Sequence, residues 1–165
     1  MRGTGLPLTI VLCFILPASA LAQGTPRWLV RVEAGSAAVH RFVDKPEGLA
    51  GGIRFARAWK GDRIRFDAGV LGSNADQGFL LVDFGGELRF LGADARIAPF
   101  VGGSVGVLAE PVYGHDRARR AGGGLEVRLG PNRLLRVAAY AGGHNARARG
   151  PHLIVVGYSQ RLGGR

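Results

Sequence analysis

The sequence predicts an all-β fold, an eight-stranded antiparallel up-and-down barrel. Three observations predict it. Apolar and polar residues alternate along eight stretches of the chain, the connections between these stretches are alternately short and longer, and the chain begins with a segment typical of exported proteins. Successive side chains of a strand point to opposite faces, so each alternating stretch has one apolar face and one polar face.

Residues 1–22 have the pattern of a secretory signal peptide. An early cation, Arg2, precedes the apolar run 6–16, and small residues precede a cleavage site at the end of the segment. The apolar run is shorter than the roughly 20 residues of a spanning helix. Cleavage would remove Cys13, the only cysteine, and leave residues 23–165 as one domain without thiol chemistry.

The eight alternating stretches are 27–37, 50–60, 62–72, 77–91, 96–109, 121–130, 133–142 and 152–163. In RIRFDAGVLG, the clearest of them, Ile64 and Phe66 alternate with Arg65 and Asp67. In chain order, the apolar faces carry Trp28, Val30 and Val32; Ile53, Phe55 and Trp59; Ile64, Phe66 and Val70; Leu80, Val82 and Phe84; Leu125 and Val127; Ile154, Val156 and Tyr158. The alternation is weaker in 96–109 and 133–142, although Arg136 again lies opposite its apolar neighbours.

The connections indicate which face is turned inward. Short connections at 60–62, 92–95 and 131–132 alternate with longer ones at roughly 38–49, 73–76, 110–120 and 143–151. Outer-membrane barrels have short periplasmic turns and longer external loops, an apolar outer face and a polar lumen. Trp28, Trp59, Phe90 and Tyr158 fall toward the short-turn end, where an aromatic girdle is expected. The sequence therefore predicts a transmembrane barrel, with a soluble barrel as the alternative.

A charged network is the first candidate site. If the apolar faces meet lipid, the opposite faces bring arginines and carboxylates into a narrow lumen, where the planar guanidinium suits confined pairing. The expected members of this network are Arg63, Arg65, Asp67, Asp83, Glu87, Arg89, Glu126 and Arg128. The same faces also carry Arg31, Glu33, Arg54, Arg136 and Arg161.

Two basic clusters, HDRARR (115–120) and HNARAR (144–149), form the second candidate site. The chain has a formal net charge of +10, and an exported basic protein meets lipopolysaccharide phosphates and anionic lipid rather than nucleic acid. Solvated loops are the alternative interpretation. The arginines expected to contact lipopolysaccharide are Arg117, Arg119, Arg120, Arg147 and Arg149.

The stretches APFVGGSVGV (98–107) and GGGLEVRLG (122–130) resemble strands of small eight-stranded outer-membrane barrels of the OmpA, OmpX and OmpW type. This resemblance implies a structural or surface-interaction role in the cell envelope. It implies a monomer in the outer membrane of a Gram-negative-type bacterium, without catalytic site or cofactor. The four histidines lack the close spacing of a zinc site, so no metal is expected.

A second, weaker resemblance is to lipid A deacylases of the PagL type, on His144, Asn145 and Ala146. The serine nucleophile of that family is missing here, and no carboxylate follows Glu126 to orient the histidine. A non-enzyme is therefore expected. A divergent deacylase and a soluble periplasmic calycin-like barrel that binds an apolar ligand remain the alternatives.

Overall fold

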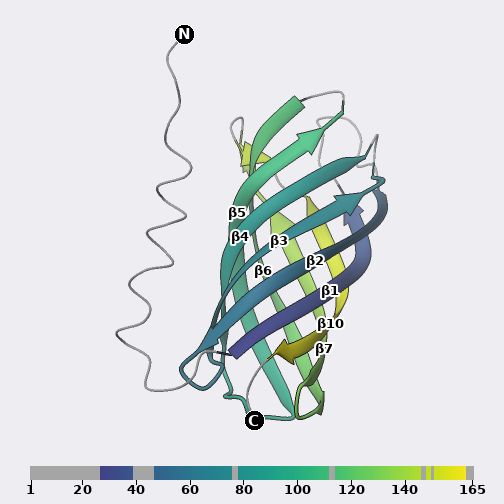
Figure 1. Cartoon of the computed structure of the whole chain (residues 1–165). Coiled ribbons are helices and arrows are strands. Elements are labelled where there is room, and N and C mark those ends of the chain that lie inside the picture. Colours follow the sequence, from purple (N-terminus) through teal and green to yellow (C-terminus); the bar gives the residue numbers. More distant parts are fainter. Residues whose placement is uncertain are drawn as a thin grey trace.

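The computed structural model describes residues 27–38, 47–75, 78–111, 114–145, 148–149 and 151–162. The regular elements of these residues are all β-strands (Figure 1). The predicted signal peptide lies outside the described residues and stays an expectation. In the described ranges, no helix is long and apolar enough to cross a membrane.

Eight long strands form the wall, and two short strands lie in the connection before the last of them. The long strands are β1 (Arg27–Ala38), β2 (Glu47–Trp59), β3 (Ile64–Ser73), β4 (Phe79–Arg89), β5 (Ile97–Glu110), β6 (Gly114–Gly130), β7 (Arg133–Gly142) and β10 (His152–Leu162). The short strands are β8 (His144–Asn145) and β9 (Ala148–Arg149).

The long strands pair antiparallel with their neighbours in an up-and-down order. The sheet runs β5-β4-β3-β2-β1-β10-β7-β6, and the pairing of β5 with β6 closes it. The closed eight-stranded barrel predicted from the sequence is thus confirmed. Both the start of β1 and the end of β10 lie at the end of the barrel that carries the short turns (Figure 1).

The strands are strongly staggered around the barrel. The chain of paired residues that starts at Arg117 on β6 passes once around the wall and returns to β6 at Val127, ten residues further on. With ordinary strand spacings, this stagger corresponds to a tilt of about 40° from the barrel axis. A row of paired residues therefore climbs the wall as it crosses from strand to strand.

Alternation along β3 shows how the two faces are turned. Arg65 and Asp67 are 0% and 8% exposed, whereas Phe66 and Val70 are 46% and 41% exposed. The charged face points into the barrel and the apolar face points out. A calycin-like barrel with an apolar interior and a solvated exterior would have the reverse arrangement.

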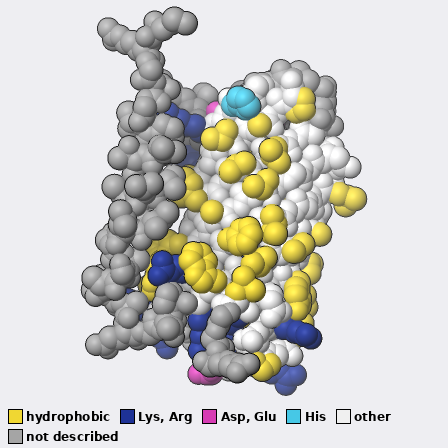
Figure 2. Space-filling view, in the orientation of Figure 1, with side chains coloured by type: hydrophobic (Ala, Val, Ile, Leu, Met, Phe, Trp, Pro, Cys, Tyr) yellow, Lys and Arg dark blue, Asp and Glu magenta, His cyan; other side chains and the backbone are white. Residues whose placement is uncertain are grey.

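Large apolar side chains cover the outer wall. Figure 2 shows hydrophobic side chains spread over the visible face of the barrel. Exposed examples from each long strand are Val32, Phe55, Phe66, Phe84, Val105, Leu125, Val137 and Val156. Together they form the apolar outer surface that a barrel in lipid requires.

The lumen has two layers. A buried apolar cluster fills the end that carries the longer connections, with Leu71, Leu81, Leu108 and Leu153 among its members. The charged residues occupy the part nearer the short turns, and Leu29 and Leu134 lie in a second small apolar cluster. The charged residues therefore fill only part of the lumen. Successive apolar residues occur in strands such as β3 and β4, and one of each pair must point inward.

The predicted loop at 110–120 is wrong. Strand β6 begins at Gly114, and its first residues pair with β5 as far as Glu110. Alternation does continue there, because Ala118 and Arg120 are buried whereas Arg117 and Arg119 are exposed. The outward side chains are charged in this segment, so the apolar pattern that marks the other strands is absent.

Candidate functional site

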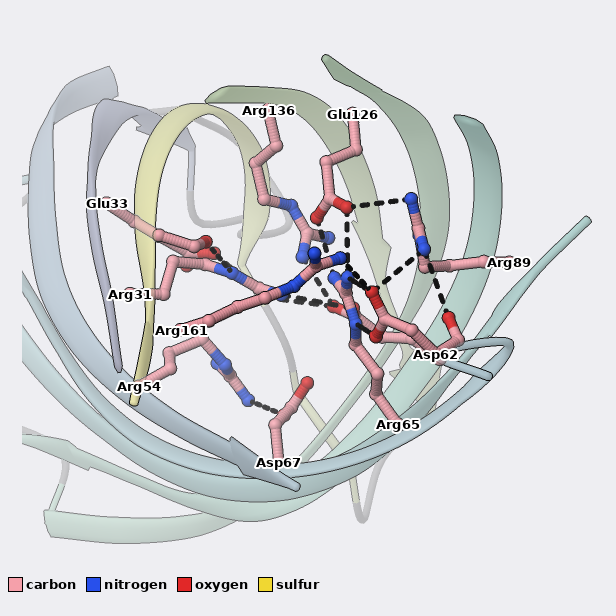
Figure 3. A network of polar contacts seen from close by, with 12 residues as sticks. Arg31, Glu33, Arg54, Asp62, Arg65, Asp67, Arg89, Glu126, Arg136 and Arg161 are labelled. Atoms are coloured by element: carbon pink, nitrogen blue, oxygen red, sulfur yellow. Dashed lines mark hydrogen bonds and ion pairs between the residues drawn. The ribbon is translucent and has the colours of Figure 1, made fainter. Parts of the chain in front are cut away.

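A network of buried ion pairs occupies the lumen and is the candidate site (Figure 3). Its arginines come from seven different strands, and each is less than 10% exposed. They are Arg31, Arg54, Arg65, Arg89, Arg120, Arg136 and Arg161. Its carboxylates are Glu33, Asp62, Asp67, Asp83, Glu87 and Glu126.

Asp62 lies at the end of the network nearest the short turns. Arg65 donates to both of its oxygens at 2.6 and 2.8 Å, and Arg89 and Arg161 donate to Oδ2 at 3.0 and 2.5 Å. The turn residues Lys60, Gly61 and Asp62 all have positive φ angles. This left-handed run interrupts the strand alternation and turns the Asp62 side chain into the lumen.

The charge state of Asp62 follows from these contacts. Burial raises the pKa of its carboxyl, but the hydrogen bonds and charge of Arg65, followed by the charges of Arg89 and Arg161, outweigh burial. The net effect places the pKa of Asp62 below its usual value of 3.8. Asp62 is therefore ionised over the whole neutral range.

Glu87 joins the middle of the network. Arg31 donates to its two oxygens at 3.0 and 3.1 Å, in the bidentate geometry that gives the strongest guanidinium–carboxylate pairs. Arg136 donates to Oε1 of Glu87 at 2.6 Å and to the Tyr140 hydroxyl at 2.5 Å. Strands β1, β4 and β7 are thereby joined across the barrel interior.

Glu126 links the middle of the network to the turn. Arg65 donates to its two oxygens at 2.6 and 2.9 Å, and Arg89 lies 3.1 Å from Oε1. Because Arg65 also contacts Asp62, one guanidinium joins two carboxylates that belong to β6 and to the β2–β3 turn.

A second group of contacts lies further toward the longer connections. Arg54 is 2.5 Å from Asp67 and 2.9 Å from Asp83. Arg120 is 2.8 Å from Asp83, whose Oδ2 also accepts a hydrogen bond from the Ser104 hydroxyl. Asp83 therefore joins β2, β5 and β6 through β4.

Glycines make room for these long side chains. A Cβ at Gly69 would meet the side chain of Arg54, and one at Gly102 would lie 3.1 Å from the Glu87 side chain. The interleaving of small and charged residues in the sequence therefore has a steric reason. The narrow lumen can hold an arginine side chain only where the neighbouring strand carries a small residue.

The structure brings six of the eight predicted network residues together: Arg65, Asp67, Asp83, Glu87, Arg89 and Glu126. Arg63 was assigned to the lumen wrongly. The left-handed turn directs the side chain of Asp62, instead of that of Arg63, into the lumen. Arg63 is exposed just before β3 begins. Asp62, which the sequence reasoning placed in a connection, is the network residue that it missed.

Arg128 was also assigned to the network wrongly. Its guanidinium lies 3.6 Å from the exposed carboxylate of Asp94, at the short-turn end of the barrel. The pairing of β6 with β7 shifts register between Arg128 and Gly130, so the strand is irregular there. Arg128 belongs to the barrel rim rather than to the buried network.

The five arginines predicted to contact lipopolysaccharide separate into three groups. Arg120 was wrongly predicted to contact lipopolysaccharide, because its side chain points into the lumen and pairs with Asp83. Arg117 and Arg119 are exposed on the outer face of β6. Arg147 lies outside the described residues, and of Arg149 only the backbone is described, paired with Ala118.

The resemblance to deacylases falls on a segment of which little is described. His144 and Asn145 form β8, and Ala146 lies outside the described residues. Among the described residues, no group of three or more histidine, cysteine or acidic side chains is placed to hold a metal ion. The interactions that the described side chains make in the lumen are mainly ion pairs.

No family model and no curated protein matches this chain. Solved structures with a similar fold include Neisserial surface protein A, with a TM-score of 0.68 at 10% identity over 82% of this chain and 97% of that one. Ail of Yersinia pestis, in complex with the heparin analogue sucrose octasulfate, gives 0.53 at 10% identity over 83% and 99%. The outer membrane enzyme PagL gives 0.51 at 16% identity over 81% and 99%.

These likenesses extend over nearly the whole of each compared barrel. The chain thus has the fold of the small eight-stranded outer-membrane barrels, as the resemblance in its sequence indicated. The same fold serves surface proteins and an enzyme, so the fold by itself does not decide between these roles.

Proposed function

We propose that this protein is an outer-membrane barrel with a non-catalytic role at the cell surface, and that its outer rim binds lipopolysaccharide phosphates. The observation that carries the proposal is the position of Arg117 and Arg119. Both are exposed on the outward face of β6, next to a wall whose other outward side chains are mainly apolar.

The expected orientation of the barrel supports an outer-leaflet position for these arginines. Outer-membrane barrels keep their short turns in the periplasm and their longer connections outside. Arg117 and Arg119 are among the first residues of β6, after the connection at 111–113. This connection lies at the same end of the barrel as the longer connections before β2 and before β10, which the rule puts outside. The phosphates of lipopolysaccharide lie at that level of the membrane.

The two arginines lie on the same face of one strand, two residues apart, so their Cα atoms are about 7 Å from each other. The backbone of Arg149 lies beside Ala118, between them. Each guanidinium can bind a phosphate through two parallel hydrogen bonds. The described part of the chain therefore offers a compact pair of cations on the outward face of β6.

Similarity to Ail supports an anionic ligand. Ail was solved with sucrose octasulfate, a densely anionic sugar. The proposed ligand of the present barrel has the same chemistry, an anionic group on a carbohydrate. A non-catalytic role is supported by the lumen, where arginines neutralise each carboxylate of the network.

Replacing Arg117 and Arg119 together by serine should weaken binding of the refolded barrel to lipopolysaccharide micelles by about tenfold, because two charge-assisted contacts are lost. The salt dependence of binding should also decrease, since fewer exposed charges remain to be screened. Titration of lipopolysaccharide at two salt concentrations measures both effects.

The matched control replaces Arg63 and Arg133, two exposed arginines at the short-turn end. This variant has the same net charge but should bind as the unmodified protein does. If both double variants lose affinity equally, binding depends on overall charge and the proposed site at Arg117 and Arg119 is wrong. Unchanged affinity in the Arg117 and Arg119 variant would also contradict the proposal.

A further inference from the structure

Arg57 is an outward-facing cation within the aromatic part of the wall. It belongs to β2, where it is half-buried, and its partners across the sheet are Trp28 on β1 and Phe66 on β3. Its guanidinium carbon lies 5.5 Å from the ring centre of Trp28 and 5.0 Å from that of Trp59. Both distances are within the range of cation–π attraction.

The charge of Arg57 has no carboxylate at ion-pair distance among the described residues, and its buried Nε has no hydrogen-bond partner there. A cation on a lipid-facing wall is costly unless it reaches an anion at the interface. Its neighbours Trp28 and Trp59 are aromatic residues of the kind that lies at the headgroup level. The anion available to Arg57 in that position is a lipid phosphate.

A groove in the outer wall begins beside this arginine. Phe66 pairs with Gly86, Gly86 with Gly103, and Gly103 with Ala121. This row of outward residues, which are small after Phe66, crosses three strand spacings, about 14 Å. A groove of about 470 Å³ follows it, with Phe66, Leu88 and Val101 among its walls.

The stagger of the barrel gives the groove its direction. Rows of paired residues descend from β6 through β5 and β4 toward β2, as the displacement from Arg117 to Val127 shows. The groove therefore rises from Arg57 toward the middle of the apolar wall. A phospholipid with its phosphate on Arg57 would direct an acyl chain along this path.

We propose that Arg57, held between Trp28 and Trp59, and the groove from Phe66 to Ala121 form a binding site for one phospholipid of the periplasmic leaflet. The guanidinium binds the phosphate, and one acyl chain passes the Phe66 ring, which lies against Gly86, and continues over Gly103 and Ala121. The inference rests on the proposed membrane location. Its phosphate contact at Arg57, near the end of β2, lies at the opposite end of the barrel from Arg117 and Arg119.

The site contains its own reporter, because Trp28 and Trp59 are the only tryptophans of the chain. The barrel is refolded in a neutral detergent and titrated with phosphatidylglycerol whose acyl chains carry bromine, which quenches tryptophan emission. We expect saturable quenching at a low mole fraction of lipid. The variant R57Q should need about tenfold more lipid, because a charge-assisted contact to phosphate is lost.

The groove is tested separately through A121L, which places a larger side chain on an exposed position of its wall. We expect weaker quenching by the brominated lipid in this variant. The matched control is A139L, at an exposed position of β7 away from the groove lining. Folding of every variant is checked by the heat-dependent shift in electrophoretic mobility that barrels show.

Two further titrations distinguish a phospholipid headgroup from free phosphate as the ligand of Arg57. Inorganic phosphate should not relieve the quenching, and brominated diacylglycerol, which has no phosphate, should quench equally in unmodified protein and R57Q. Full relief by inorganic phosphate, or equal titrations of phosphatidylglycerol by unmodified protein and R57Q, would overturn the site. Recovery of the unmodified protein outside the membrane fraction would instead overturn the proposed function.

Discussion

Replacing Glu87 by alanine is expected to lower the free energy of unfolding in detergent by about 3–5 kcal/mol. The variant leaves Arg31 and Arg136 buried without the carboxylate that they share. A buried charge without a partner keeps its desolvation cost and loses its compensating attraction. Equilibrium unfolding in urea, followed by tryptophan emission, measures the change.

Two further variants identify the cause. Asp94 also pairs with an arginine but is fully exposed, so Asp94→Ala should leave the unfolding midpoint unchanged. A double variant, Glu87→Leu with Arg31→Met, should be less destabilised than the sum of its single changes, because it removes both members of a pair. If Glu87→Ala unfolds at the same midpoint as the unmodified protein, the carboxylate does not hold the network together.

Asp62→Asn should be comparably destabilising at neutral pH, because it removes the negative charge that faces Arg65, Arg89 and Arg161. We expect a loss of about 3–5 kcal/mol. The effect has a particular pH dependence. Since the folded-state pKa of Asp62 lies below its usual value of 3.8, its contribution to stability is fully present above that value and is lost as the pH falls through the lower, folded-state pKa.

The difference in stability between the unmodified protein and Asp62→Asn should therefore be constant near neutrality and decrease below about pH 4. Urea midpoints measured from pH 7 to pH 3 give this difference directly. Asp94→Ala is again the control, since an exposed carboxylate should give no such convergence. A difference that stays the same down to pH 3 would show that the charge of Asp62 does not stabilise the fold.

Strand alternation predicted two-faced strands, and the exported N-terminus, the alternation of short and longer connections and the aromatic positions predicted which face is turned outward. A residue such as Phe66 could be placed outside and Asp67 inside because the period of a strand is fixed by its backbone geometry. The stretch 114–120 was missed because its outward residues are Arg117 and Arg119. Because Arg120 of the same segment points inward, both faces carry charge there, and the alternation of apolar and polar residues disappears.

The network was predicted in part for a related reason. Alternation cannot be extended through a turn, so the left-handed run that directs Asp62 inward and Arg63 outward could not be derived from period two. Nor could the pairing of Arg65 with Glu126, which are 61 residues apart, because strand stagger decides which inward positions meet. The Asp62–Arg65 spacing gave no signal without the turn conformation.

The central claim is that the apolar face of each strand meets lipid and the charged face fills the lumen. Single cysteines on β3 test it most directly, with Cys13, the only native cysteine, replaced by serine. The test positions are Ala68 and Val70, which are exposed outward, and Leu71, which is 2% exposed inside the barrel. Each carries a bimane fluorophore, attached before the protein is refolded into phospholipid vesicles.

Nitroxide groups on the lipid acyl chains then serve as the quencher. The account predicts strong quenching at Ala68 and Val70 and weak quenching at Leu71. A water-soluble quencher should affect none of the three strongly. If the water-soluble quencher reduces the emission at Ala68 and Val70 while the lipid nitroxides do not, the outer wall faces water and the transmembrane assignment is contradicted.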